Sequence, residues 1–84
     1  MRTRDFLVVA GHIWHCERCR QALLDSPERV LRGFKLSEQE RAALLSLQPE
    51  DFESAQALIS RLDITSAEFE EGVSHPRSRM RHLV

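Results

Sequence analysis

The sequence lacks any long hydrophobic run. Its longest uninterrupted apolar stretch is FLVVA, residues 6–10, whereas a membrane-spanning helix needs about 20 consecutive apolar residues. The stretch is also too short for the hydrophobic region of a secretory signal, and no small-residue cleavage site follows it. We therefore expect a cytoplasmic protein with no membrane partner.

Cysteine and the aromatic residues are scarce. The 84 residues include two cysteines, one tryptophan, four phenylalanines and no tyrosine. Hydrophobic residues make up 42% and charged residues 30%, which is typical of one folded domain and not of a disordered chain. A domain of this length is only marginally stable alone, and a metal, a disulfide or a partner often supplies the missing stability. In the cytoplasm, two nearby cysteines are more typical of a metal site or a reactive thiol pair than of a structural disulfide.

Lysine is nearly absent as well, since eleven of the twelve basic residues are arginine. The formal net charge of −1 hides a segregation: residues 1–35 carry +3, residues 36–72 carry −7 and residues 73–84 carry +3. The basic tail can pair with the acidic middle, or either can face a partner. Three arginines beside a strongly acidic segment make a poor electrostatic footprint for nucleic acid, which argues against that class of partner.

Capping residues and prolines mark the starts of most helices. Two capping boxes begin at Ser37 and Thr65, each with a glutamate three residues later. Pro27 and Pro49 stand where a helix accepts proline, at its first positions. Gly33 is placed to end a helix in the left-handed conformation. The predicted helices span about residues 5–14, 16–25, 27–33, 38–47, 49–62 and 66–72, the last ending near Gly72. The first two could also form one continuous helix.

Only residues 6–9 look locally like a strand. A lone strand would have no partner, because no later segment alternates polar and apolar residues, so we prefer a helix there. The sequence thus predicts an all-α, compact bundle of five to six short helices in a single domain, residues 1–76. Residues 77–84 would form a basic C-terminal tail that is extended or folds over the body.

One segment resembles a known family of small helical domains. The string CRQALLDSPERVLRGFKLSEQERAALLSL, which begins at Cys19, is similar to the small (alpha) subunit of extradiol protocatechuate-type dioxygenases and to related precursors of ribosomally made modified peptides. The segment GVSHPRSRM resembles the glycine-valine-histidine-proline end of those subunits, with Ser74 inserted. The similarity covers about residues 5–76. The matching positions are Arg20, Leu23, Leu24, Pro27, Leu31, Gly33, Phe34, Leu36, Ser37, Glu40, Arg41, Ala43 and Leu44.

The resemblance implies a helical fold and one of two roles. As a dioxygenase-type small subunit, the protein would help cover the active site of a larger catalytic partner. As a peptide precursor, it would carry a modified C-terminal core, although only Ser78 among the usual modified residue types follows Pro76. The chain departs from the family at Cys16-Glu17-Arg18-Cys19, where relatives have Asp-Pro-x-Phe.

This departure creates a candidate metal site. His12, Cys16 and Cys19 stand at i, i+4 and i+7 and would share one face of a helix. Thiolate and imidazole are the ligands that Zn²⁺ prefers, in a set of four. The pattern HxxxCxxC also resembles zinc-binding anti-sigma factors. His75 is our first choice for the fourth ligand, and the alternatives are His82, a carboxylate, water or a residue of a partner.

Two other interpretations of the cysteines stay open. Free cysteines are often small buried hydrophobic residues with no chemical role. Alternatively, Cys16 at a helix N-terminus and Cys19 could form a redox-active dithiol, since the helix end favours a thiolate. A haem-attachment motif is excluded because Arg20, and not histidine, follows the second cysteine.

Four residues are candidates for partner binding. Trp14 is either a core anchor or a partner-facing aromatic, because tryptophan and arginine are enriched at binding hot spots. The tail arginines are either solvated or dock on an acidic or phosphate-bearing surface. The candidate set is Trp14, Arg77, Arg79 and Arg81.

No catalytic signature is visible in the sequence, such as a Ser-His-Asp triad, paired carboxylates or a glycine-rich loop. We therefore expect a non-enzymatic accessory or adaptor protein with a structural zinc site, bound to a larger protein. If the resemblance to dioxygenase small subunits holds, that larger protein is an enzyme. The alternatives are a modified-peptide precursor and a thiol- or zinc-based redox regulator of the anti-sigma type. The sequence leaves open whether the chain also forms homo-oligomers.

Overall fold

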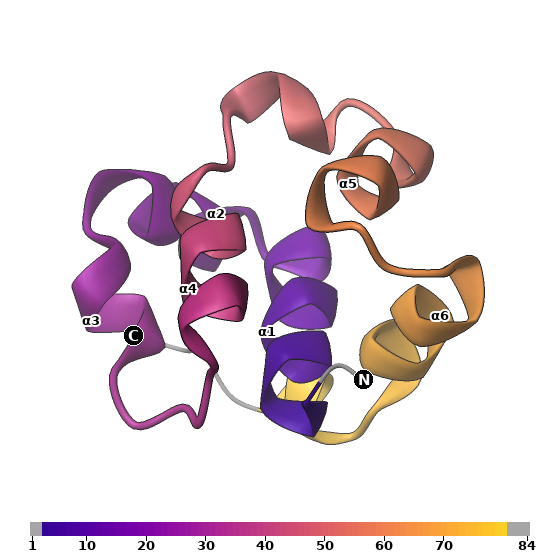
Figure 1. Cartoon of the computed structure of the whole chain (residues 1–84), viewed down its shortest axis with the longest axis horizontal. Helices are drawn as coiled ribbons and strands as arrows, with labels where there is room; N and C mark the ends of the chain where they lie inside the picture. The colour runs from indigo at the N-terminus through magenta and orange to yellow at the C-terminus, as the bar shows by residue number, and fades with distance from the viewer. Residues whose placement is uncertain (1–2, 81–84) are drawn as a thin grey trace.

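The computed structural model describes residues 3–80, and this part of the chain is helical with no strand (Figure 1). Its elements are α1 (Arg4–His15), α2 (Glu17–Asp25), α3 (Pro27–Leu31), α4 (Glu38–Leu45), the 3-10 helix η1 (Pro49–Phe52), α5 (Ala55–Leu62), α6 (Ser66–Ser74) and α7 (Arg77–Met80). The all-α prediction is confirmed. The described residues form seven α-helices where the sequence predicted five or six.

Helix α1 is the centre of the fold. In Figure 1 it lies between α2, α3 and α4 on one side and α5 and α6 on the other. Every residue from Phe6 to Ile13 is buried, so the helix contacts neighbours all round. A helix that is buried on every face reads as a continuous apolar run, which explains why residues 6–9 alone resembled a strand.

Two glycines let α6 lie directly against α1. A Cβ atom added to Gly72 would overlap the main-chain carbonyl of Leu7, and one added to Gly11 would overlap the carbonyl of Gly72. The expected helix end near Gly72 is wrong, because α6 continues to Ser74. Gly72 lies within the helix because only a residue without a side chain permits this close approach of two backbones.

The predicted helix over residues 49–62 is divided into η1 and α5. Ser54 has extended backbone angles, and its hydroxyl accepts a hydrogen bond from the amide of Ala57 at 3.1 Å. Such a side-chain cap begins a new helix. By contrast, Gly33 has a φ of 87°, the left-handed conformation predicted for it at the end of α3.

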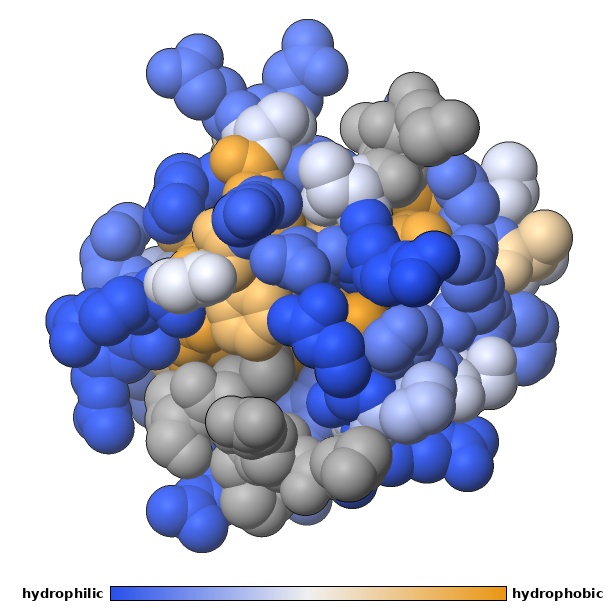
Figure 2. Space-filling view, turned by 90° about the horizontal axis from the view of Figure 1, so that it is seen from below, coloured by the Kyte–Doolittle hydropathy of each residue, from blue (hydrophilic) through white to orange (hydrophobic). Residues whose placement is uncertain are grey.

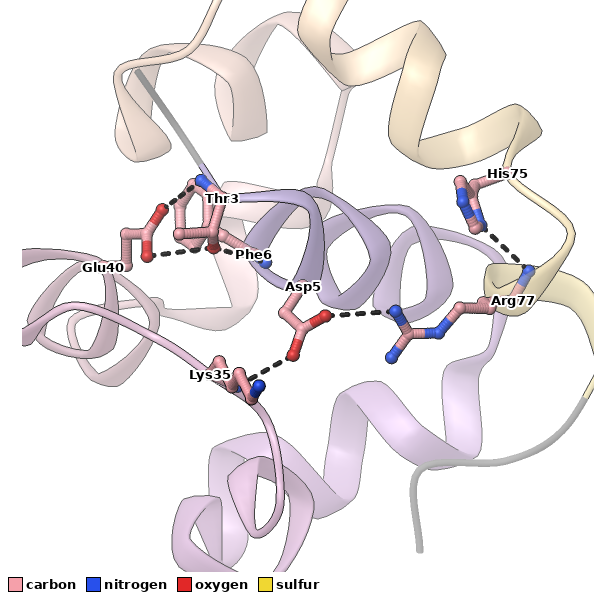
Figure 3. Close-up of polar contacts among 7 residues, drawn as sticks. All are labelled: Thr3, Asp5, Phe6, Lys35, Glu40, His75 and Arg77. Carbon is pink, nitrogen blue, oxygen red and sulfur yellow. Dashed lines mark hydrogen bonds and ion pairs between the residues drawn. The ribbon is translucent and has the colours of Figure 1, made fainter.

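The first residues of the tail fold over the body. Residues 77–80 form α7, which packs on α1 and α6, so these four residues are not extended. Ser78 is only 1% exposed. The guanidinium of Arg77 pairs with the carboxylate of Asp5 at 3.0 Å (Figure 3). Residues 81–84 lie outside the described part of the chain.

The outer surface is mainly polar. Figure 2 shows a face on which hydrophilic side chains dominate and hydrophobic surface emerges only in small areas between them. Among the described residues, Leu45 is the large hydrophobic side chain that stands out, with 46% of its area exposed. Within residues 3–80, none of the helices combines the length and the apolar character that crossing a bilayer requires.

Candidate metal centre

The candidate metal centre lies where α1 ends and α2 begins. Cys16 has extended backbone angles, φ −106° and ψ 107°, and separates the two helices. Its amide donates to the carbonyl of His12 at 2.7 Å, and its carbonyl accepts from the amide of Arg20 at 2.9 Å. The same residue therefore ends one helix and begins the next. The three predicted ligands come from both helices and the junction, and not from one continuous helix.

The structure brings His12, Cys16 and Cys19 together, and we call these three residues the ligand group. Their donor atoms all lie within 4.8 Å of one another, which is close enough to hold a metal ion. In a tetrahedral zinc site with Zn–S of about 2.3 Å and Zn–N of about 2.0 Å, donor atoms are roughly 3.5–3.8 Å apart. Binding would therefore require movements of about 1 Å or less, which small side-chain rotations supply.

Two of the three residues of the ligand group are buried. His12 is 4% exposed and Cys19 is 0% exposed, whereas Cys16 is half-buried. An ion or an additional ligand would therefore approach beside Cys16, at the junction between the helices. Burial also protects a bound ion from exchange with competing ligands in solvent.

The ring of His12 is oriented by the tail. Its Nδ1 lies 2.6 Å from the main-chain carbonyl oxygen of Ser78, in a buried contact. A carbonyl oxygen can only accept, so Nδ1 carries the proton and donates it. In the neutral ring the lone pair then belongs to Nε2. Metal-binding histidines commonly donate their other ring N–H to a carbonyl or carboxylate in this way.

Arg20 stabilises the junction that carries the ligand group. Its Nε donates to the carbonyl of Ile13 at 3.0 Å, and a terminal nitrogen donates to the carbonyl of Trp14 at 2.8 Å. Its guanidinium also lies over the ring of Phe52, 4.9 Å from the centroid. Arg20 thus satisfies carbonyls at the end of α1 that the helix leaves without partners.

The structure places His75 outside the ligand group. His75 caps the end of α6, where its Nδ1 accepts a hydrogen bond from the amide of Arg77 at 3.1 Å (Figure 3). The histidine next to Cys16 is also elsewhere, since His15 contacts the carbonyl of Val73 at 3.2 Å. Within residues 3–80 the group has three members. The fourth ligand stays a prediction, and His82 lies outside the described residues.

The anchor of α7 combines charge and hydrogen bonding. Asp5 accepts a hydrogen bond from the amide of Lys35 at 2.8 Å and pairs with Arg77 at 3.0 Å (Figure 3). The hydrogen bond from Lys35 is the main reason why the pKa of Asp5 lies below its usual 3.8, and Arg77 lowers it further against the opposing effect of burial. Asp5 is therefore ionised at neutral pH and holds the tail.

The candidate partner-binding residues have contacts within the chain. Trp14 is half-buried and packs edge-on against Phe69, with ring centroids 5.7 Å apart and an angle of 74°. Arg79 is exposed, and its Nε donates to the carbonyl of Val73 at 3.3 Å. Arg81 lies outside the described residues. Trp14 is thus part of the core periphery, and partner binding by these residues stays a prediction.

Two contributors to the site were not identified from the sequence. The sequence pattern gives Arg20 no role in the site, although its place directly after CxxC is a usable signal. Ser78 contributes a main-chain carbonyl to His12. Since every residue has a carbonyl, no sequence signal could have indicated this contact.

Comparisons of the chain with protein-family models, with curated proteins and with solved structures found no match. The resemblance to dioxygenase small subunits and to anti-sigma factors therefore stays a prediction.

Proposed function

We propose that this protein is a non-enzymatic helical accessory protein that binds one zinc ion through His12, Cys16 and Cys19. The observation that carries the proposal is the convergence of one imidazole and two thiols within 4.8 Å at the α1–α2 junction. Two sulfur ligands with one nitrogen ligand suit Zn²⁺ better than Mg²⁺ or Ca²⁺, which prefer oxygen.

The role proposed for the ion is structural. A bound ion would link the end of α1 to α2 through its three ligands. His12 also contacts α7 through the main-chain carbonyl of Ser78. A small domain gains much of its stability from such a cross-link. Water, a tail residue or a residue of the partner would complete the coordination beside Cys16.

The metal part of the proposal is tested by metal analysis of protein purified without an affinity tag. We expect about one zinc ion per chain, and loss of that zinc in His12→Ala, Cys16→Ser and Cys19→Ser. His15→Ala is the matched control, because His15 is the neighbouring histidine outside the ligand group. Zinc-free wild-type protein that also fails to bind added Zn²⁺ would refute the proposal.

The accessory part of the proposal rests on the family-like segment and on the exposed, basic Arg79 beside Arg77. We expect the chain in native extracts to migrate with a larger protein in a fixed ratio during gel filtration. Migration as the free 9.7 kDa chain would argue against an accessory role and leave the metal site unaffected.

A redox regulator is the second candidate, because both thiols belong to the same group. Hydrogen peroxide would oxidise Cys16 and Cys19 to a disulfide, with two electrons and two protons passing to the peroxide to form two molecules of water. The test is intact mass together with zinc release after addition of hydrogen peroxide. We expect a mass loss of two hydrogens and release of the ion, whereas retention of both thiols at high peroxide excess would exclude this function.

A further inference from the structure

We infer that metal occupancy of the ligand group controls the docking of α7 on α1. This inference rests on the zinc binding proposed above and adds a regulated element to it. The connection is a single buried contact, 2.6 Å long, between the ring of His12 and the main-chain carbonyl of Ser78. The Nε2 atom of the ring would bind the metal, while the Nδ1–H group donates to the tail.

The chemistry of imidazole couples the two events. When Nε2 binds a cation, electron density is drawn from the ring and the proton on Nδ1 becomes a stronger hydrogen-bond donor. A bound ion also fixes the ring in the orientation that reaches Ser78. Coupling between two binding events is reciprocal, so a docked tail raises metal affinity by the same factor as the metal favours docking.

The position of α7 depends on the contact between His12 and Ser78. Helix α7 has only four residues, too few to be stable by its own hydrogen bonds. Its buried residue, Ser78, has its hydroxyl near the carbonyls of Val73 and His75. The other anchors that the structure describes are the hydrogen bond from Arg79 to the carbonyl of Val73 and the ion pair between Arg77 and Asp5. Both lie at the surface, where such contacts contribute little.

Release of α7 would change what the protein presents to a partner. In the docked state Arg77 is paired with Asp5, and the backbone on either side of Ser78 is held against α1. In the released state the guanidinium of Arg77 is free to pair with carboxylates of another protein. The metal state of the ligand group would thus determine whether this basic segment is available.

Limited trypsin digestion tests the inference, because α7 carries its own cleavage sites at Arg77 and Arg79. We expect zinc to slow cleavage at these two sites by roughly fivefold or more, in the range of typical coupling between sites. Cleavage at Arg61 on α5 serves as the internal reference for global unfolding. Cys19→Ser, which removes a ligand, should show no zinc effect at Arg77 and Arg79.

The reciprocal effect is tested by zinc affinity in variants of the tail. Ser78→Leu puts a large side chain where there is almost no exposed space and should displace α7, lowering zinc affinity by about 10- to 100-fold. Ser78→Ala keeps the carbonyl and a small side chain and should retain affinity within about threefold. Unchanged circular dichroism of both variants shows that the core still folds.

The possible outcomes separate this inference from the proposed function. If zinc slows cleavage at Arg61 but leaves cleavage at Arg77 and Arg79 unchanged, the ion stabilises the whole fold without holding α7, and the specific control of α7 is refuted. If His82→Ala lowers zinc affinity as much as Ser78→Leu, the tail acts as a ligand and not through the carbonyl of Ser78. If no zinc binds, the proposed function and this inference both fail.

Discussion

At the scale of single residues, the three glycines of the chain have different physical roles. Gly33 supplies a left-handed turn with a φ of 87° and has no heavy atom within 4 Å of an added Cβ. Gly11 and Gly72 have ordinary helical backbones but face another backbone at closer than contact distance for a methyl group. The first glycine is required by conformation, and the other two are required by packing.

Gly72→Ala should therefore be the more damaging glycine substitution. Overlap with the carbonyl of Leu7 forces α6 away from α1, and we expect the free energy of unfolding to fall by about 3 kcal/mol or more. Gly33→Ala, the comparison variant, meets only backbone strain and should cost about 1–2 kcal/mol. Urea denaturation measures both values. A Gly72→Ala protein as stable as wild type would show that the two helices do not approach as closely as described.

Glu40 is a buried carboxylate that joins α4 to the start of α1. It is 2% exposed and accepts hydrogen bonds from the amide of Thr3 at 2.8 Å and the hydroxyl of Thr3 at 3.1 Å (Figure 3). It also accepts a hydrogen bond from the amide of Ser37 at 2.9 Å. Burial raises the pKa of Glu40, but the hydrogen bonds from Ser37 and Thr3 outweigh it, and the pKa lies below its usual 4.5.

Acid should therefore destabilise the protein through Glu40. A carboxyl whose pKa is lower in the folded state stabilises the fold above its unfolded-state pKa, near 4.5, and this contribution is lost as pH falls through the folded-state value. We expect Glu40→Gln to lower the free energy of unfolding by about 1–3 kcal/mol at pH 7, because the side-chain NH2 of glutamine is a donor and cannot accept the main-chain N–H groups. The difference from wild type should shrink below pH 4. Urea denaturation across this pH range checks it, and the exposed Glu38→Gln should show neither effect.

At the scale of secondary-structure elements, the α1–α2 junction is held by one side chain. Arg20 lies on α2. Its guanidinium group donates to the carbonyls of Ile13 and Trp14 near the end of α1 and lies over the ring of Phe52 of η1. Three elements thus meet at a planar guanidinium. A lysine has one compact ammonium and cannot reach two carbonyls and a ring at once.

Arg20→Lys should consequently destabilise the fold although it conserves charge. Loss of one charge-assisted hydrogen bond and of the ring contact predicts a decrease of about 1–3 kcal/mol in the free energy of unfolding. Arg18→Lys is the control, since Arg18 is exposed on the same helix and should change stability by less than about 0.5 kcal/mol. Equal stability of the two variants in thermal denaturation would contradict the role given to Arg20.

At the scale of the whole molecule, the charge segregation does not produce the pairing that the sequence first suggests. The described tail residue Arg77 pairs with Asp5 of the N-terminal basic segment, and not with the acidic middle. Within residues 3–80, the acidic middle has an ion pair of its own between Asp51 and Arg61 at 3.2 Å. The fold brings Asp5 and Arg77 together because α7 packs on α1.

Metal binding should stabilise the whole molecule. A ligand that binds only the folded state at 100 times its dissociation constant adds about 2.7 kcal/mol, which for a domain of this size raises the melting temperature by roughly 10–20 °C. We expect this shift on adding Zn²⁺ to the wild type, its reversal by a chelator, and no shift in the Cys16→Ser, Cys19→Ser double variant. Differential scanning calorimetry measures it. An equal shift in the double variant would place the stabilising ion elsewhere.

Local sequence signals were sufficient for most helix boundaries. The capping boxes at Ser37 and Thr65 are present as predicted, and the break between residues 14 and 16 is found at Cys16. Errors occurred where a local signal competed with packing. Gly72 suggested a helix end, but it lies inside α6, where it permits the close contact with α1. The apolar face of residues 49–62 suggested one helix, but the cap at Ser54 divides this segment in two.

The sequence alone determined the all-α class, most helix boundaries and the identity of the three metal-ligand candidates, because capping, periodicity and residue spacing are local properties of the chain. Only the tertiary structure decided that α1 is buried on all sides, that His75 is outside the ligand group, and that the carbonyl of Ser78 orients His12. The burial of α1 and the orientation of His12 depend on contacts between segments that are far apart along the chain, such as His12 and Ser78. Main-chain carbonyls are the same at every position, so nothing in the residue order marks the one that meets the ring.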